Sequence, residues 1–121
     1  MTEKVFDLEK RTLIFATGVR DFVRDLPKSA INLEYSKQLI RSSSSVGANY
    51  IEANESLGSK DFLMRLKICR KEAKESVYWL RLTTVGTNPA LVQKHDRLLN
   101  EATEITRIFT TICRKNALII Q

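Results

Sequence analysis

The sequence predicts an all-α protein, a single domain spanning residues 1–121 that folds as an up-down-up-down antiparallel four-helix bundle. Glycine and proline are scarce, with four and two residues in the chain, whereas an all-β fold needs a turn every few residues. The helix breakers cluster at three places and leave four long segments. Apolar residues recur along these segments in alternating steps of three and four, the pattern of helices packed at shallow angles. Short connections between long helices make sequential neighbours antiparallel.

The first helix is predicted over about residues 4–26. It ends at Leu26-Pro27-Lys28, because proline lacks an amide hydrogen and disfavours helix at the residue before it. Its apolar stripe, expected to face the core, consists of Val5, Leu8, Thr12, Phe15, Val19, Phe22 and Leu26.

The second helix is predicted over about residues 32–57 and contains the run Ser42-Ser43-Ser44-Ser45-Val46-Gly47, which has poor helix propensity. A serine-rich run can also be a linker. Tyr35, Leu39, Val46 and Ala53 nevertheless keep helical spacing through it. We therefore interpret the run as a buried helix whose small residues let a neighbouring helix approach closely.

The third and fourth helices are predicted over about residues 60–85 and 89–119. Gly58 suits a helix end and Ser59 an N-cap, while Gly86-Thr87-Asn88-Pro89 offers a C′ glycine, an N-cap asparagine and a proline at the first helical position. The third stripe is Phe62, Leu66, Cys69, Ala73, Ser76 and Leu80. The fourth is Leu91, His95, Leu98, Ala102, Ile105, Phe109 and Ile112.

Composition favours a cytoplasmic protein with no membrane segment. Met1-Thr2-Glu3-Lys4 leads into no apolar stretch of the kind that marks a signal peptide. Apolar runs reach four residues, whereas a membrane span needs about 20. Cys69 and Cys113 are expected to be free, buried thiols in a reducing compartment.

Motifs in the second and third segments resemble a known family. They are Arg41-Ser42-Ser43, Val46-Gly47-Ala48-Asn49-Tyr50-Ile51-Glu52-Ala53, Lys60-Asp61-Phe62, Lys71-Glu72-Ala73-Lys74-Glu75 and Trp79-Leu80, together with the loop Leu26-Pro27-Lys28. As an ordered set they resemble the bacterial four-helix bundle proteins first noticed as products of intervening sequences inside 23S rRNA genes. Ala53 departs from the pattern, since many members have glycine there, and this indicates a subgroup.

The resemblance implies a ring-shaped homopentamer. It also implies similarity to the accessory protein of diversity-generating retroelements, a basic pentamer that binds nucleic acid and a reverse transcriptase. The family as a whole has no well-defined biochemical role.

The third segment carries most of the positive charge. Residues 60–81 contain seven Lys or Arg and three Asp or Glu, a net +4 of the chain's +6. At 100° per residue, one helix face, roughly opposite the core stripe, collects a set that we call the basic row: Lys60, Lys67, Arg70, Lys71, Lys74, Tyr78 and Arg81. Such a row can neutralise phosphates, and its tyrosine can stack on a base. The alternative is an ordinary solvated, lysine-rich face.

Polar residues near the core stripes are expected to be structural. We predict a polar network of Arg41, Asn49, Glu52, Glu72 and Ser76 that fixes helix register or oligomer order. Glu55 lies one helical turn after Glu52, and Glu75 one turn after Glu72, so paired carboxylates on facing helices could bind two metal ions. Di-iron bundles, however, require Glu-x-x-His motifs, and His95, the only histidine, does not lie three residues after a glutamate. No metal site, nucleotide site or cofactor is predicted, and His95 is interpreted as a packed or rim residue and not a partner of a catalytic cysteine.

Ile68 and Trp79 lie on a flank of the third helix about 100° from its core stripe. An apolar flank of this kind is either an oligomer contact or a wider core face. The resemblance favours the oligomer contact.

Two functions follow from the sequence. The first is a non-enzymatic, basic, oligomeric bundle that binds the backbone of RNA or DNA with little sequence specificity, since no base-reading motif is present. The alternative is a structural or protein–protein interaction module whose charge only maintains solubility. No catalytic residues are predicted.

Overall fold

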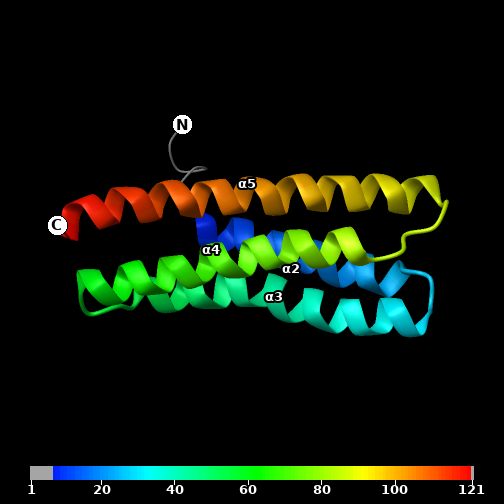
Figure 1. The fold of residues 1–121 in the computed structure, drawn as a ribbon, viewed down its shortest axis with the longest axis horizontal. Helices are drawn as coiled ribbons and strands as arrows, with labels where there is room; N and C mark the ends of the chain where they lie inside the picture. The colour runs from blue at the N-terminus through cyan, green and yellow to red at the C-terminus, as the bar shows by residue number, and fades with distance from the viewer. Residues whose placement is uncertain (1–6, 121) are drawn as a thin grey trace.

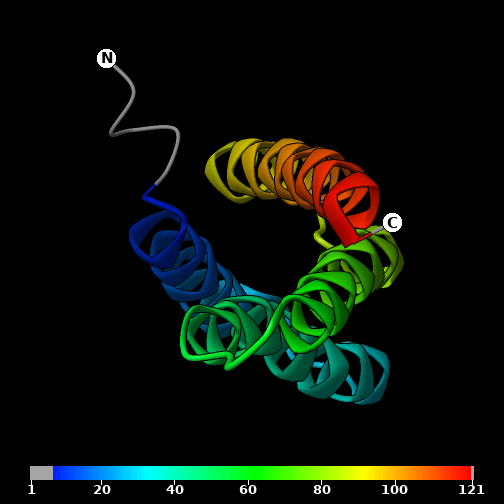
Figure 2. The ribbon, with the colours of Figure 1, turned by 90° about the vertical axis from the view of Figure 1, so that its left-hand side faces the viewer.

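The computed structural model describes residues 7–120, which form four helices and no strand. They are α2 (Leu8–Asp25), α3 (Ala30–Asn54), α4 (Ser59–Leu82) and α5 (Pro89–Ile120). Figure 1 shows the helices running side by side with short connections, and Figure 2, viewed from one end, shows them following one another around an arc. Each helix packs against the next, and α5 also contacts α2. This arrangement agrees with the predicted four-helix bundle.

The observed helix bounds differ from the predicted ones by a few residues. The predicted start at residue 4, and Val5 of the first stripe, lie outside the described residues. Helix α2 begins after Asp7, whose carboxylate accepts a hydrogen bond from the Lys10 amide at 3.2 Å. It ends at Asp25, and its C-cap Leu26 is extended with ψ 145°, as expected for a residue before proline.

Helix α3 is continuous through the serine run, so the linker interpretation is wrong and the helix interpretation is confirmed. It begins at Ala30 because the Ser29 side chain accepts a hydrogen bond from the Asn32 amide at 3.0 Å. It ends at Asn54, three residues before the predicted end. The amides of Glu55 and Ser56 turn back to the carbonyls of Glu52 and Ala53 and close the last turn.

The predicted caps of the last two helices are partly wrong. Gly58, and not Ser59, is the N-cap of α4, and its carbonyl accepts the Phe62 amide at 3.0 Å. Helix α4 ends at Leu82, so Gly86 lies in the following loop, where it adopts φ 82° and is not a C′ residue. The predicted Asn88 cap is found: its side-chain oxygen accepts the amides of Ala90 and Leu91.

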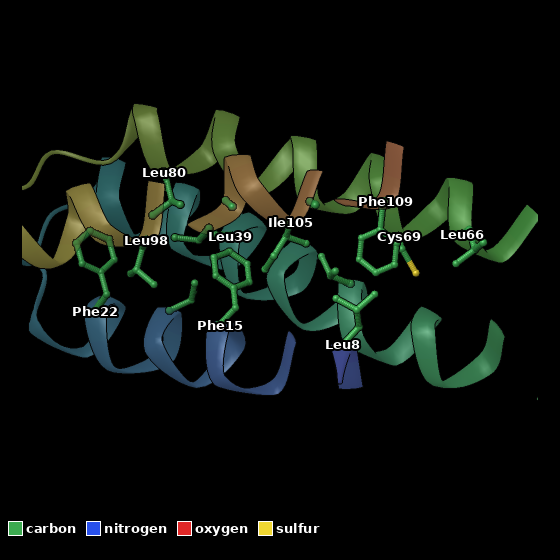
Figure 3. Close-up of a cluster of buried hydrophobic side chains, with 14 of the residues drawn as sticks. Leu8, Phe15, Phe22, Leu39, Leu66, Cys69, Leu80, Leu98, Ile105 and Phe109 are labelled. Carbon is green, nitrogen blue, oxygen red and sulfur yellow. The ribbon is translucent and has the colours of Figure 1, made fainter. Parts of the chain in front are cut away.

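The core runs the length of the bundle between the four helices (Figure 3). The apolar stripes supply it, and the largest fully buried side chains include Phe15, Phe22 and Phe109. Four predicted stripe residues, Tyr35, Phe62, His95 and Ile112, are half-buried. The buried hydroxyls of Thr12 and Ser76 donate to carbonyls of their own helices, Thr12 to that of Leu8 at 2.7 Å and Ser76 to that of Glu72 at 2.9 Å. The stripe pattern therefore identified most of the core.

Small residues of α3 sit where its neighbours come closest. Gly47 faces Thr12 of α2, and a Cβ placed on this glycine would lie 2.8 Å from the Thr12 hydroxyl oxygen. Ser42 faces α4 from within the core, and its hydroxyl lies 2.8 Å from that of Ser76. The serine run is therefore a helix segment with contacts to two neighbours.

None of the described helices carries an apolar stretch long enough to cross a membrane.

Candidate nucleic-acid interface

Helix α4 lies between α3 and α5 and has one face turned to water. Its core side is buried, including Leu66, Ala73 and Leu80. The basic row occupies the outer side: Arg70 is half-buried and the other six members are exposed. The structure therefore leaves the whole row accessible along one helix.

The charges of α4 are separated between its two flanks. The thiol of Cys113 on α5 has a raised pKa because it is buried, and the positive charges of Arg70 and Lys67 oppose that rise. These two cations therefore lie on the α5 side. On the opposite flank Glu72 and Glu75 bind Arg41 of α3. Helical spacing places Lys60, Lys74, Tyr78 and Arg81 on the same face as Lys67 and Arg70. Lys71 borders the acidic flank, because its Nζ lies 3.9 Å from a Glu72 oxygen.

Most cations of the row have no partner of opposite sign. Among residues 7–120 the ion pairs of α4 are those of Arg41 with Glu72 and Glu75, Arg65 with Asp61 at 4.0 Å, and Lys71 with Glu72 at 3.9 Å. Lys60, Lys67, Arg70, Lys74 and Arg81 form none with any described residue. Unpaired cations can release counterions to a polyanion without first breaking an internal ion pair.

Arg41 joins α3 to the acidic flank of α4. Its guanidinium nitrogens lie 3.1 Å from a Glu72 oxygen and 2.9 Å from a Glu75 oxygen. The hydrogen bond to Glu75, followed by that to Glu72, raises the pKa of Arg41 against the opposing effect of desolvation. Glu72 is 7% exposed, so this pairing neutralises a nearly buried carboxylate. Sequence alone did not reveal which glutamates Arg41 binds.

The structure brings together three of the five residues assigned to the polar network. Ser76 bonds to Ser42 across the helix pair and donates to the Glu72 carbonyl at 2.9 Å, one turn from the Arg41 pair. Asn49 instead donates to the Ser45 carbonyl of its own helix at 2.9 Å. Glu52 is exposed. In the single chain, Asn49 and Glu52 are separate from the Arg41 cluster.

Ile68 and Trp79, the residues assigned to an oligomer contact, are half-buried. The Trp79 ring stacks on Tyr35 of α3 with centroids 6.0 Å apart and meets Tyr78 edge-on at 5.1 Å. Its indole Nε1 is buried and has no hydrogen-bond partner among the described residues. Trp79 is therefore partly covered by its own chain.

A second apolar surface, which sequence reasoning missed, lies over α2 and α3. Small residues including Ala16, Ser44, Gly47 and Ala48 line a groove of about 600 Å³ between the two helices. Leu13 and Ile51 on its rim are 65% and 51% exposed. The sequence did contain a signal for this surface, because Leu13 and Ile51, like Ile40, are apolar residues that fall outside the core stripes.

The α2–α3 and α4–α5 loops meet at one end of the bundle through Asn32, which sequence reasoning also missed. This side chain is 3% exposed. Its amide nitrogen donates to the carbonyls of Pro27 and Thr84 at 2.9 Å each, and its oxygen accepts the Thr84 amide at 2.8 Å. No local pattern marks such a residue, because its partners are 5 and 52 residues away.

His95 has a structural position near the start of α5. Its Nε2 lies 2.8 Å from the Leu80 carbonyl, one of the last carbonyls of α4, and its ring packs against Phe22 at 5.7 Å. Cys113 is 18 residues further along the same helix, about 27 Å away at 1.5 Å per residue. This separation rules out a His95–Cys113 dyad within one chain.

The two cysteines lie in the interior of the bundle, and the acidic residues lie mainly on its surface. Cys69 and Cys113 are free and buried, and burial raises the pKa of Cys69 to about 12. A thiol with so high a pKa is a poor nucleophile at neutral pH. No group of three or more His, Cys, Asp or Glu in this range is placed to hold a metal ion.

Comparisons with known proteins agree with the fold. A sequence model of the 23S rRNA-intervening sequence protein family matches residues 6–111. The chain is similar to the crystal structure of a protein of unknown function from the S23 ribosomal protein family of Bacteroides thetaiotaomicron, with a TM-score of 0.75 and 30% identity over 92% of this chain and 98% of that one. No curated protein matches the sequence significantly.

The fold and the family match together define a four-helix protein of a family named for an intervening sequence of 23S rRNA. The chain belongs to the 23S rRNA-intervening sequence protein family. The resemblance drawn from the Arg41, Val46–Ala53 and Lys71–Glu75 motifs is thereby confirmed.

Proposed function

We propose that this protein is a non-enzymatic, oligomeric bundle that binds the phosphate backbone of RNA or DNA with little sequence specificity through the basic row of α4. The observation that carries the proposal is the separation of charge on this helix. Five cations of the row have no ion-pair partner among the described residues, while the carboxylates of the opposite flank are engaged by Arg41 and Arg65.

The test is binding of labelled RNA and DNA, followed by fluorescence anisotropy across a salt series. The affinity should fall steeply with salt, because each neutralised phosphate releases counterions. Reversing Lys67, Arg70, Lys71 and Lys74 to glutamate should abolish binding and leave the helical circular dichroism spectrum unchanged.

A matched control separates the position of the charges from their number. Lys28, Arg97, Arg114 and Lys115 are exposed and lie outside the row. Reversing all four gives the same net charge as the row variant, since +6 − 8 = −2 in both cases. The proposal requires the control to bind better than the row variant, and equal binding by the two would contradict it.

The oligomer is a second part of the proposal, and the family resemblance supports a homopentamer. Repetition of the row around a ring would multiply its electrostatic field. Light scattering should give a mass near five chains, and a monomer at micromolar concentration would contradict this part.

The α2–α3 groove favours a self-contact on that face over the flank of Ile68 and Trp79. Leu13 and Ile51 are more than half exposed, whereas Ile68 and Trp79 are already half-buried in the single chain. Leu13→Glu with Ile51→Glu should therefore dissociate the oligomer, and Ile68→Glu should not. The reverse result would assign the contact to the α4 flank.

The alternative function is a structural or protein–protein interaction module. The same α2–α3 face supports it, because an exposed apolar groove also suits a different protein. It predicts no nucleic-acid binding at physiological salt and capture of a defined protein partner that is lost in the Leu13→Glu, Ile51→Glu variant.

A further inference from the structure

The basic row contains one aromatic side chain, that of Tyr78, which is exposed to solvent. Tyr78 is 59% exposed, while its ring packs edge-on against Trp79 at 5.1 Å. Trp79 is itself stacked on Tyr35 of α3 at 6.0 Å, and it packs against the core. The Tyr78 ring is therefore supported by a tryptophan that belongs to the bundle, while more than half of the tyrosine remains exposed to solvent.

Two cations flank this ring along the helix. Lys74 precedes Tyr78 by four residues and Arg81 follows it by three, so both share its face of α4. At 1.5 Å per residue they lie about 6 Å and about 4.5 Å from it along the axis. Both are exposed and have no ion pair with any residue from 7 to 120. The face thus presents a cation, a ring and a cation within two helical turns.

We propose that the ligand of the basic row is single-stranded nucleic acid, with one unpaired base stacked on Tyr78 and the adjacent phosphates on Lys74 and Arg81. This inference rests on the proposed function and narrows its ligand class. Stacking on an aromatic side chain requires a base whose face is free, as in a single strand or a loop. A duplex would meet the same cations through its backbone, but its base faces are covered by neighbouring pairs.

The chain contains its own reporter for this contact. Trp79 is the only tryptophan in 121 residues, and its ring touches Tyr78. A base stacked on Tyr78 alters the surroundings of the indole. Single strands should therefore change the intrinsic tryptophan fluorescence on binding, and duplexes of the same length should change it much less.

The experiment compares a 12-nucleotide single strand with a 12-base-pair duplex, using anisotropy and tryptophan fluorescence in parallel. Tyr78→Ala should weaken single-strand binding by roughly 10- to 100-fold, the range of one lost base–aromatic stack. It should leave duplex binding unchanged. Tyr78→Phe should bind like the parent, because stacking needs the ring and not the hydroxyl.

Met64→Ala is the matched control, since Met64 lies on the same helix and is also 59% exposed. It should bind both ligands as the parent does. If Tyr78→Ala binds the single strand as tightly as the parent while the fourfold reversal of the row abolishes binding, the stacking inference is wrong and the proposed function stands. Duplex binding as tight as single-strand binding would also overturn the inference. If the parent binds neither ligand at low salt, both proposals fail.

Discussion

At the scale of single residues, the buried thiol of Cys69 shows how its surroundings determine the pKa of a group. Cys69 is fully buried, and desolvation raises its pKa from 9.0 to about 12, with a smaller contribution from Cys113 nearby. The folded state therefore keeps the thiol protonated where the unfolded chain releases the proton. The same burial that makes Cys69 unreactive links the stability of the fold to alkaline pH.

This link can be measured. Above about pH 9 the unfolded chain binds fewer protons than the folded one, so the free energy of unfolding must decrease as pH rises toward 12. The contribution of Cys69 has a limiting slope of about 1.4 kcal/mol per pH unit. Urea unfolding of the parent and of Cys69→Ala between pH 8 and 11 should show the steeper loss in the parent. Parallel pH profiles for the two proteins would contradict the assignment.

At the scale of the helices, the close approach of α2 to α3 depends on Gly47. An added Cβ would lie 2.8 Å from the Thr12 hydroxyl oxygen and 3.2 Å from its Cβ. Thr12 is buried and its hydroxyl is bonded to the Leu8 carbonyl, so the side chain has little room to move. Gly18 provides a contrast, because its added Cβ would meet only the end of the Leu98 side chain, at 3.1 Å.

The two glycines should therefore respond differently to the same substitution. Alanine in a helix interior gains about 1 kcal/mol over glycine in propensity. At Gly47 the overpacking should outweigh that gain and destabilise the fold by about 1–3 kcal/mol. Gly18→Ala should be neutral or stabilising. Thermal and urea unfolding of both variants check this, and equal stabilities would show that α2 can shift away from α3 at little cost.

The same helices show how far sequence could predict the fold and the candidate site. Pro27 and Asn88 act on their own neighbours, so the breaks at these positions were found from local pattern. The basic row was found because one helix carries it. The Glu72 and Glu75 partners of Arg41 depend on how α3 and α4 are aligned, which no local pattern specifies. The loop contacts of Asn32 were missed for the same reason.

At the scale of the whole molecule, α2 is the least embedded helix. It is the shortest, and its packing against α3 and α5 is less extensive than that of α4 against its neighbours. A bidentate pair ties it to α5: Arg11 Nε and Nη2 lie 2.8 Å and 2.9 Å from the Glu101 oxygens. The hydrogen bond to Glu101 raises the pKa of Arg11.

Local opening of the bundle should therefore begin at α2. Hydrogen exchange followed by mass spectrometry should show faster exchange for α2 amides than for α4 amides. Glu101→Gln should increase α2 exchange further by weakening a charge-assisted pair. Glu34→Gln is the control, because Glu34 pairs only with Lys37 of its own helix among the described residues. Uniform exchange across all four helices would instead indicate a single cooperative unit.

The side chain of Asn32 limits how far the lengths of the α2–α3 and α4–α5 loops can differ among related proteins. It joins the loop before α3 to the loop after α4, so an inserted residue in either loop displaces atoms on which the other depends. The α3–α4 connection has no comparable tie within the described residues, and Leu57 in it is fully exposed. Natural relatives should accordingly gain and lose residues between α3 and α4, while the two connections at the opposite end keep a nearly constant length.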